Sequence, residues 1–468
     1  MKTITNEEIE RQYSFMHELE AMNSGKELRF FVRTFGCQQN EADSERIAGM
    51  CREMGYKPAP DEKNADLIVV NTCAVREHAE LRALSITGQF KHLKEANPEL
   101  IIVVCGCMVT QEHRMNDIKR SYPYVDLLFG TGMLYRFPEL LLEHIKNRKR
   151  QFMIDETEGN IAEGLPVMRE SKIKAWVSIM YGCNNFCTYC VVPYVRGRER
   201  SRRREDIINE VKELIADGCR EITLLGQNVN SYGKDNGSCD FADLVREICE
   251  LDGDFILRFM TSHPKDASKK LIDTMAEFPK CAKQFHLPLQ SGSARVLKAM
   301  NRCYTPEKYL EVVEYMREKM PEIAISSDII VGFPGETEEE FTETLQLLQK
   351  VNFDMIYSFI YSPRNLTPAA KMDCQIPQEI KSARMDRLLA MQNEISLRKN
   401  QESVGKINRV LLEGESRSDK NMLTGRNDGN KLVHIPKTPE SEKLIGQFAQ
   451  IKITRAEPFA LFGELTNQ

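Results

Sequence analysis

The stretch MYGCNNFCTYCVVPYVRGRERSRRR, residues 180–204, places three cysteines within eight residues. Cys183, Cys187 and Cys190 have the spacing C-x3-C-x2-C. A closed structural zinc site uses four protein ligands, and an ordinary [4Fe–4S] cluster also binds four thiolates. Three thiolates leave one position of a metal centre open, and we interpret that open position as the active site.

Around this stretch, apolar strands alternate with amphipathic helical segments, which is typical of β-α units. The six strand segments are KAWVSIMYG, EITLLGQNV, FILRFMTSHP, QFHLPLQSGS, AISSDIIVGFPGET and MIYSFIYSP. A complete barrel of this kind has eight units. We therefore predict an open, partial (β/α)6 barrel over residues 171–403, ending in a long polar helix and carrying its site at the carboxyl ends of the strands.

The first 150 residues repeat a strand, a loop and a helix. Strands are predicted over residues 28–34 and 67–71, a third ends at Cys105, and a helix opens near residues 43–44. Such near-continuous apolar strands predict a buried parallel sheet, and we expect a flavodoxin-like fold for residues 1–150. Residues 151–170 have no clear period and are predicted to be a linker.

Each of these three strands is followed by a cysteine, namely Cys37, Cys73 and Cys107. Turns at the carboxyl ends of parallel strands lie along one edge of the sheet. The three thiols, 36 and 34 residues apart, could therefore converge on one point. The pattern predicts a second three-thiolate site.

The last segment, residues 404–468, changes to short strands separated by Gly, Asn, Asp and Pro. This rhythm predicts a small, OB-like antiparallel β-barrel of the size used to bind nucleic acids. A purely structural cap is the alternative.

Composition limits the class of protein. The chain has 468 residues, too many for one ordinary core, with 41% hydrophobic and 28% charged residues. The first residues have no apolar signal segment and no window approaches the roughly 18 apolar residues of a membrane span. We expect a cytoplasmic protein with no membrane contact, whose 14 cysteines are mostly reduced thiols.

The net charge of −5 does not indicate general affinity for nucleic acids. The charge is uneven, however, because six arginines lie within residues 196–204. Such a run can be an ordinary solvated face. Its place directly after the cysteine triplet favours a binding site for the phosphate backbone of a nucleic acid.

The triplet suits one particular chemistry. Three thiolates can bind three irons of a [4Fe–4S] cluster, and the fourth iron must then bind an outside ligand. S-adenosylmethionine offers an amine and a carboxylate beside a sulfonium, and one electron from the cluster would cleave it to a 5′-deoxyadenosyl radical. The alternative is an incomplete zinc site, which His263 or His286 could complete only through tertiary folding.

Several motifs carry a resemblance to known proteins. GCNNFCTYC resembles the radical S-adenosylmethionine (SAM) superfamily. Together with five other segments it resembles the methylthiotransferase family over nearly the whole chain, including a C-terminal TRAM domain. These segments are TFGCQQNEADSE, NTCAVREHAE, CGCM, HLPLQSGS and SDIIVGFPGET. TFGCQQN and NTCAVRE are most similar to the branch that modifies isopentenyl-adenosine (position 37) in the tRNA anticodon loop.

The resemblance implies roles for individual residues. Cys183, Cys187 and Cys190 would hold the radical-generating cluster, and Cys37, Cys73 and Cys107 an auxiliary [4Fe–4S] cluster. Contacts to SAM are implied for Tyr189, Gly226, Gln227, Asn228, Gln290, Ser291, Asp328, Ile330 and Phe333. Ordinary strand-end packing is the alternative for each of these.

Basic residues would bind the phosphates of the substrate, and aromatic side chains would stack on its splayed base. The candidates for tRNA contact are Arg196, Arg198, Arg200, Arg409, Arg426 and Lys431. Tyr361 and Phe359 could line an isopentenyl pocket or simply pack in the core. YSPRNLTPAA has Asn365 and Leu366 where the family pattern suggests Pro–Gly, which puts the geometry of that loop in question.

The implied reaction consumes two SAM molecules and places a methylthio group on carbon 2 of the adenine. An electron donor such as flavodoxin or ferredoxin is implied, and we expect a monomer. Related branches act on threonylcarbamoyl-adenosine in tRNA or on an aspartate of a ribosomal protein. A protein of another class, a non-catalytic iron–sulfur carrier, would need neither six barrel units nor an arginine run.

Overall fold

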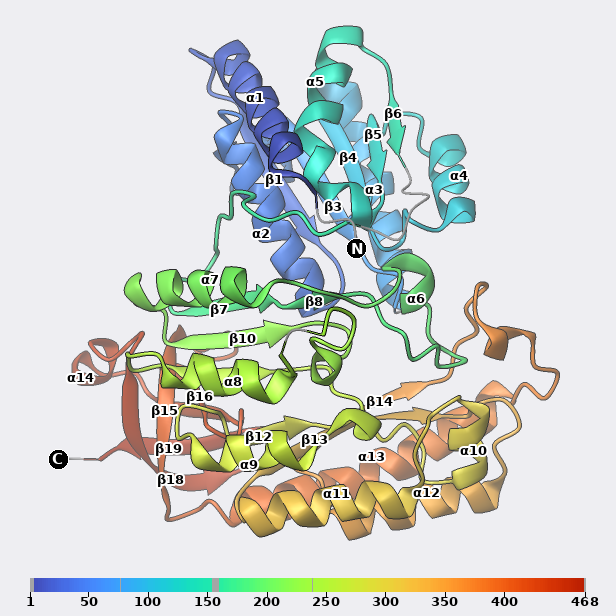
Figure 1. The fold of residues 1–468 in the computed structure, drawn as a ribbon, viewed down its shortest axis with the longest axis vertical. Helices are drawn as coiled ribbons and strands as arrows, with labels where there is room; N and C mark the ends of the chain where they lie inside the picture. Colours follow the sequence, from blue (N-terminus) through green and yellow to red (C-terminus); the bar gives the residue numbers. More distant parts are fainter. Residues whose placement is uncertain (1–3, 76, 154–159, 238, 467–468) are drawn as a thin grey trace.

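The computed structural model describes residues 4–75, 77–153, 160–237 and 239–466. Figure 1 shows the N-terminal sheet above the central partial barrel, with the C-terminal barrel beside the lower part at the left. Within the described ranges, no helix has the length and apolar content needed to cross a membrane.

The N-terminal part is a six-stranded sheet with the order β2-β1-β3-β4-β5-β6 and only parallel pairings. Its strands are β1 (Arg29–Thr34), β2 (Lys57–Pro58), β3 (Leu67–Thr72), β4 (Ile101–Gly106), β5 (Leu127–Phe129) and β6 (Gln151–Met153). Its helices are α1 (Asn6–Asn23), α2 (Gln38–Glu53), α3 (Glu77–Ala96), α4 (Glu112–Ser121) and α5 (Phe137–Asn147), with short 3-10 turns η1 (Glu62–Asn64) and η2 (Thr131–Arg136).

Alternate residues of β3 enter two separate cores. Leu67 and Val69 pack with α1, α2 and α5, whereas Ile68 and Val70 pack with α3 and α4 on the other face. Both faces of the sheet are therefore buried, which explains why the strands read as unbroken apolar runs. The predicted flavodoxin-like sheet is confirmed.

Two local predictions differ from the structure. The helix α2 begins at Gln38, five residues before the predicted start. Its first turn was missed because the buried residues Gln39 and Asn40 are polar and break the apolar period. The sheet also gains β6, which pairs with β5 inside the segment predicted as a linker. The part of that linker at residues 154–159 lies outside the described residues.

The central part contains the six predicted strands in chain order. They are β7 (Lys174–Ser178), β10 (Glu221–Leu225), β11 (Ile256–Phe259), β12 (Gln284–His286), β13 (Ala324–Val331) and β14 (Met355–Ile360). They form two three-stranded parallel sheets, β7-β10-β11 and β12-β13-β14. An isolated parallel bridge joins Leu257 of β11 to Cys281, in the segment that leads into β12. The open, partial (β/α)6 barrel is confirmed.

Helices cover the outside of this barrel (Figure 1). They are α7 (Arg204–Ala216), α8 (Phe241–Glu250), α9 (Lys269–Glu277), α10 (Ala294–Ala299), α11 (Pro306–Lys319), α12 (Glu338–Val351) and α13 (Gln378–Gln401). Shorter elements lie at its mouth, namely β8 (Met180–Tyr181), α6 (Val192–Val195), β9 (Arg200–Ser201), η3 (Val229–Ser231), η4 (Pro264–Asp266) and η5 (Pro368–Lys371).

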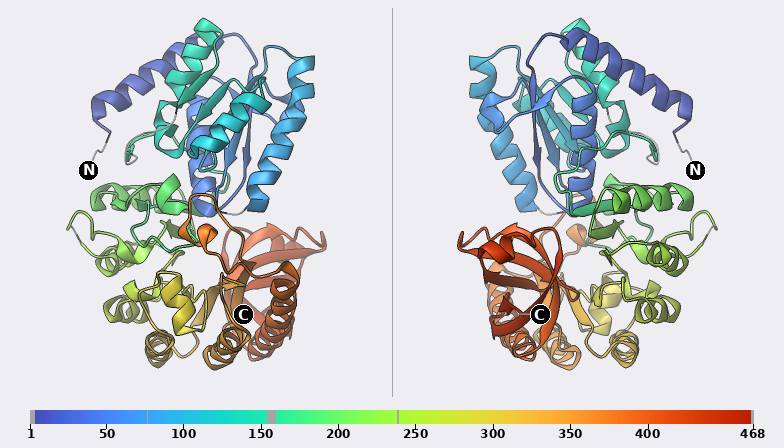
Figure 2. Two further views of the ribbon diagram at one scale, coloured as in Figure 1. Left: turned by 90° about the vertical axis from the view of Figure 1, so that its right-hand side faces the viewer. Right: turned by 90° about the vertical axis from the view of Figure 1, so that its left-hand side faces the viewer.

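The C-terminal part is a closed barrel with the order β15-β16-β17-β19-β18. Its elements are β15 (Ile407–Glu415), β16 (Met422–Asn427), β17 (Leu432–Pro436), α14 (Pro439–Glu442), β18 (Phe448–Ala456) and β19 (Leu461–Leu465). The predicted small barrel is confirmed, and Figure 2 shows it beside the central helices.

The small barrel closes the amino-terminal end of the partial barrel. Arg258 on β11 is 4% exposed and donates to the backbone oxygens of Asn427 and Asp428 at 2.7 and 2.8 Å. The same guanidinium pairs with Glu221, the first residue of β10, at 2.8 Å. The carboxyl ends of the strands, where the cysteine triplet lies, therefore form the open mouth.

Candidate functional site

The three N-terminal cysteines follow three neighbouring strands, β1, β3 and β4. A Cβ atom on Gly36 would lie 2.5 Å from the Cβ of Cys73, so the turn that carries Cys37 rests directly on Cys73. Burial raises the pKa of the Cys107 thiol to about 12, and Cys73 and Cys37 are close enough to contribute to that rise. The predicted convergence is present, and the ligand role of these thiols stays a prediction.

Asn40, on the first turn of α2, is completely buried and links the turn at Cys37 to the strand end before Cys73. Its amide oxygen accepts from the Cys37 thiol at 3.3 Å, and its amide nitrogen donates to the backbone oxygen of Thr72 at 2.9 Å, next to Cys73. Asn40 is not among the residues predicted for this site. Its place within the quoted motif TFGCQQNEADSE was the available signal.

The second triplet lies on a loop that the pairing of β8 with β9 closes at its base. The backbone of Cys183 donates to Gly197 at 3.1 Å, and that of Gly182 donates to the side chain of Gln227 at the end of β10. Gly182 has a φ of +77°, and a Cβ there would lie 2.0 Å from the Arg198 carbonyl oxygen. Only glycine fits this position, so the loop conformation depends on it.

The thiols of the second triplet are sheltered from water. Burial raises the pKa of Cys183 to about 11 and that of Cys190 to about 12. Such thiols become thiolates when a metal binds, because the metal replaces the proton. The third thiol, Cys187, receives a hydrogen bond from the buried Arg302 at 3.5 Å. No motif in the sequence marks Arg302 as a neighbour of the triplet.

The donor set fits an iron–sulfur cluster better than zinc. Within the described part of the chain, no three His, Cys, Asp or Glu side chains are close enough to hold a single ion. A [4Fe–4S] cluster binds each thiolate at a different iron, so its ligands stand further apart than those of one zinc ion. His263 and His286 are already engaged, with Lys265 N–H at 3.3 Å and the Ser326 hydroxyl at 3.0 Å.

The mouth of the partial barrel contains buried polar atoms that lack a protein partner among the described residues. They are Asn228 Oδ1, both amide atoms of Asn230, Ser262 Oγ and Gln290 Oε1. Each follows a barrel strand at its carboxyl end. Buried polar groups are normally hydrogen-bonded, so these atoms fit a polar ligand such as the amino, carboxylate and ribose groups of SAM.

The predicted SAM contacts lie in different surroundings. Tyr189, Ile330 and Phe333 belong to one apolar cluster beside the triplet loop. Gln227, Asn228 and Gln290 are polar groups of the mouth, whereas Gly226 serves close packing, because a Cβ there would lie 2.5 Å from the Met180 side chain. Asp328 faces His286 at 3.5 Å.

Ser291 is the exception among these predicted contacts. It is completely buried, and its hydroxyl lies 3.4 Å from Thr344 on α12 and accepts from the Ser293 N–H at 3.2 Å. These contacts hold α12 against the turn, so the structure does not support its prediction as a SAM contact.

The two cysteine sites meet at one junction. Val191 and Val195, directly after the triplet, pack in one buried cluster with Ala74 and Cys107. The loop with the unusual Asn365–Leu366 pair also reaches across, since Arg364 donates to the Val75 backbone oxygen at 3.1 Å. The departure from the family pattern therefore lies in a segment that contacts the N-terminal part, close to Cys73.

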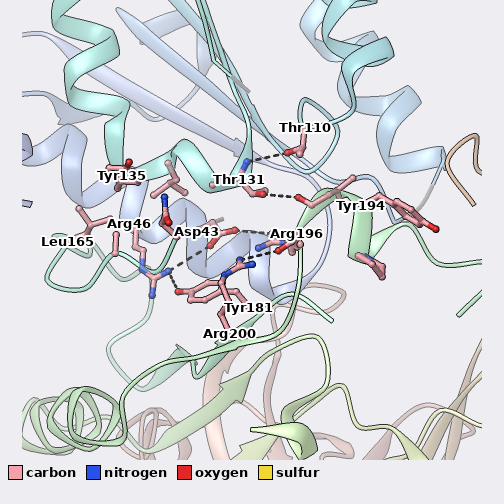
Figure 3. A pocket seen from close by; sticks show the side chains of 17 residues that line it. Asp43, Arg46, Thr110, Thr131, Tyr135, Leu165, Tyr181, Tyr194, Arg196 and Arg200 are labelled. Atoms are coloured by element: carbon pink, nitrogen blue, oxygen red, sulfur yellow. Dashed lines mark hydrogen bonds and ion pairs between the residues drawn. The ribbon is translucent and has the colours of Figure 1, made fainter. Parts of the chain in front are cut away.

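Beside this junction lies a cavity of about 320 Å³ (Figure 3). Arg196 forms one wall of it and pairs with Asp43 at 2.9 Å. The Nε of the same guanidinium donates to the Sγ of Cys107 at 3.1 Å. Because Arg196 is 7% exposed and fully engaged, the structure does not support its predicted contact with tRNA.

Three other predicted RNA contacts lie in the small terminal barrel. Arg409 pairs with Asp254, and Lys431 pairs with Asp354 at 2.9 Å, so both hold the small barrel against the central part. Arg426 donates to the Asn430 backbone oxygen at 2.9 Å within its own hairpin. These contacts do not support the predicted RNA role for these three residues.

The two remaining arginines, Arg198 and Arg200, lie on the triplet loop. Arg198 is exposed and stacks over Phe186 at 4.3 Å, whereas Arg200 donates to two backbone oxygens of the same loop. The predicted aromatics Phe359 and Tyr361 belong to the end of β14, where Tyr361 packs edge-on against Phe333. Their roles toward a substrate stay predictions.

Three family models match the chain. Residues 29–130 match the uncharacterized protein family UPF0004, residues 177–348 the radical SAM superfamily and residues 401–466 the TRAM domain. The chain also resembles in fold a solved radical S-adenosylmethionine methyltransferase, TsrM from Kitasatospora setae. The TM-score is 0.54 at 16% identity over 73% of this chain and 75% of that one, a likeness that shows the fold alone.

Curated relatives match over almost the full length. A tRNA-2-methylthio-N(6)-dimethylallyladenosine synthase from Thermoanaerobacter sp. (strain X514) is 50% identical over 99% of this chain and 98% of that protein. The protein of the same name from Clostridioides difficile (strain 630) is 47% identical over the same shares. With this similarity across all three parts, the chain belongs to the family of tRNA-2-methylthio-N(6)-dimethylallyladenosine synthases within the radical SAM superfamily.

Proposed function

We propose that the protein inserts a methylthio group at carbon 2 of N6-isopentenyl-adenosine at position 37 of the tRNA anticodon loop, consuming two SAM molecules per turnover. The observation that supports this proposal is the junction of two three-thiol sites, where Val191 and Val195 of one share a buried cluster with Ala74 and Cys107 of the other. A carrier protein needs no such meeting of two incompletely ligated sites.

Each thiol triplet has a separate role in the proposal. Cys183, Cys187 and Cys190 hold the radical-generating [4Fe–4S] cluster, and Cys37, Cys73 and Cys107 hold the auxiliary one. When bound, the first cluster and SAM supply a 5′-deoxyadenosyl radical that removes a hydrogen atom, and the auxiliary cluster supplies the site for sulfur.

The chain's own residues bind and orient the reactants. Asn228, Asn230, Ser262 and Gln290 present unpaired polar atoms to SAM at the mouth. Tyr189 and Phe333 form an apolar wall beside them, which suits an adenine ring. These atoms are fixed by strand ends, so the ligand meets a preformed site.

The proposal also covers partners. The substrate is tRNA carrying isopentenyl-adenosine, and the exposed Arg198 beside the mouth is a candidate for its phosphates. A one-electron donor of the flavodoxin or ferredoxin kind reduces the first cluster, and the protein acts in the cytoplasm as a monomer.

Anaerobic reconstitution tests the function. The proposal expects about eight irons per chain in two clusters, and 5′-deoxyadenosine on addition of dithionite and SAM. Cys183→Ala should abolish that product, whereas the matched control Cys105→Ala, at a buried cysteine that ends the core strand, should keep it. Product formation by Cys183→Ala would contradict the proposal.

A substrate comparison separates the branches of the family. RNA stem-loops bearing isopentenyl-adenosine, threonylcarbamoyl-adenosine or plain adenosine are offered side by side and analysed by mass spectrometry. We expect the methylthio product from the isopentenyl substrate alone. Equal reaction of plain adenosine would overturn the substrate assignment while leaving the radical chemistry intact.

A further inference from the structure

Each cysteine triplet has one buried arginine against one of its sulfur atoms. Arg302 Nη1 lies 3.5 Å from Cys187 Sγ, and Arg196 Nε lies 3.1 Å from Cys107 Sγ. Both arginines are 7% exposed. A buried guanidinium remains charged, so each triplet has a fixed positive charge at hydrogen-bond distance.

The counter charge differs between the two sites. Arg302 donates its other hydrogen bonds to uncharged oxygens, the Tyr304 hydroxyl at 3.1 Å and the Pro288 carbonyl at 2.8 Å. Within the described ranges, no carboxylate forms an ion pair with it. A buried charge that lacks a partner is strongly unfavourable, so the charge of Arg302 favours an anion at Cys187.

Arg196, by contrast, already has a carboxylate partner. Asp43 on α2 lies 2.9 Å from its Nη2, and Asp43 also faces the cavity of Figure 3. The positive charge that Arg196 offers to Cys107 is therefore partly neutralised by Asp43, which also lies 3.9 Å from Arg46. The two arginines share a position against a thiol and differ in whether a carboxylate pairs with them.

We propose that Arg302 and Arg196 are positioning residues that act through Cys187 and Cys107 to set the reduction potentials of the two clusters, and that Asp43 lowers the potential of the auxiliary cluster alone. The proposal rests on the proposed function, which assigns these cysteines as ligands. Reduction adds one electron to a cluster, and a nearby positive charge or a hydrogen bond to a ligand sulfur stabilises the added negative charge.

The imbalance has a functional consequence. The uncompensated Arg302 makes the radical-generating cluster the easier one to reduce, whereas the Arg196–Asp43 pair keeps the auxiliary cluster oxidised at the same potential. An electron from a one-electron reductant therefore goes to the cluster that cleaves SAM. Neither arginine needs to touch SAM or the RNA for this effect.

The test measures the midpoint potential of each cluster separately in the full chain. A variant with Cys37, Cys73 and Cys107 changed to Ala retains only the radical-generating cluster, and a variant with Cys183, Cys187 and Cys190 changed to Ala retains only the auxiliary one. Each is reconstituted, analysed for iron and titrated with dithionite while the EPR signal of the reduced cluster is followed.

In the first background we expect Arg302→Met to lower the midpoint potential and Arg302→Lys, which retains the charge, to lower it less. In the second we expect Arg196→Met to lower the potential and Asp43→Asn to raise it. Arg258→Lys, at an equally buried arginine at the far end of the barrel, should change neither potential.

The outcomes separate the two proposals. If neither background takes up about four irons, the cluster assignment fails and the proposed function with it. If clusters form but Arg302→Met and Asp43→Asn leave both potentials unchanged, only the present inference is overturned. Asp43→Asn, which changes a charge without changing the size of the side chain, keeps the test decisive even where Arg302→Met does not fold.

Discussion

The amide oxygen of Asn40 lies 3.3 Å from the sulfur of Cys37. The same side chain reaches the strand end before Cys73 and faces Arg196 at 3.4 Å, which in turn touches Cys107. One buried amide therefore links the surroundings of all three N-terminal thiols. It belongs to the first turn of α2, and its position depends on the early start of that helix.

This arrangement predicts that Asn40→Ala impairs the auxiliary site. The substitution leaves the groups around it without partners, at a cost of about 1–3 kcal/mol. Iron analysis after reconstitution should show loss of about four irons with a lower melting temperature. Asn97→Ala, at an exposed asparagine, is the control and should change neither value. Full iron content in Asn40→Ala would contradict the linking role.

A second prediction concerns Gly182 in front of the triplet. Gly182→Ala would place a Cβ 2.0 Å from the Arg198 carbonyl oxygen, so the loop must move and the radical-generating cluster should fail to assemble. The matched control is Gly218→Ala, because Gly218 has a similar φ of +88° but open space around it. That control should cost only the conformational penalty of roughly 1–2 kcal/mol. The measurement is 5′-deoxyadenosine formation together with iron content.

The buried Glu336 predicts a pH dependence of stability. Burial raises its pKa to about 7, while the Gly332 N–H and Arg384 oppose that rise. An unfolded glutamate has a pKa of about 4.3, so the folded state binds this proton more tightly. Its contribution to stability is complete below about pH 4.3 and is lost as the pH rises through about 7.

Thermal melting between these pH values measures the effect. Glu336→Gln should reduce the fall in melting temperature across this range, because glutamine stays neutral throughout. Glu338→Gln is the control, since Glu338 also pairs with Arg384 but is half exposed, and Arg387 and Arg384 lower its pKa. An unchanged slope in Glu336→Gln would show that the raised pKa has no bearing on stability.

The terminal barrel carries a half-buried stack of two aromatic rings that suits RNA. His434 and Phe462 stack with ring centres 5.3 Å apart, and the exposed Arg455, which also pairs with Glu457 of the same barrel, lies 3.6 Å above Phe462. Aromatic faces bind splayed bases, and arginine adds phosphate contact. We expect Phe462→Ala and Arg455→Ala to weaken binding of the tRNA substrate, with a smaller salt dependence for Arg455→Ala.

Arg409→Ala is the contrasting variant for this surface. It removes an arginine that pairs with Asp254 across the two parts, so it should lower stability and leave RNA affinity unchanged. Affinities are compared by fluorescence titration at two salt concentrations. Equal loss of affinity in Arg409→Ala and Arg455→Ala would contradict the assignment of the binding face.

Strand patterns predicted the fold of all three parts of the chain. Unbroken apolar runs marked the parallel strands of the first two parts, and short strands between turn residues marked the small barrel. The convergence of Cys37, Cys73 and Cys107 followed from the same rule, since strand ends of a parallel sheet share an edge. Residues whose role depends on tertiary partners could not be predicted in this way. The arginine run predicted Arg196 as an RNA contact, but its neighbours in the structure are Asp43 and Cys107, which are distant in sequence.

The small terminal barrel also has a consequence for the central one. Arg258 and Glu221 form an ion pair that is shielded from water, and the turn at Asn427 and Asp428 supplies the remaining acceptors of that guanidinium. A chain truncated after α13 would leave the floor of the catalytic barrel uncovered, with its charged pair hydrated and its strands free to splay. Removal of the terminal barrel therefore takes away the TRAM domain and, at the same time, contacts that stabilise the central barrel.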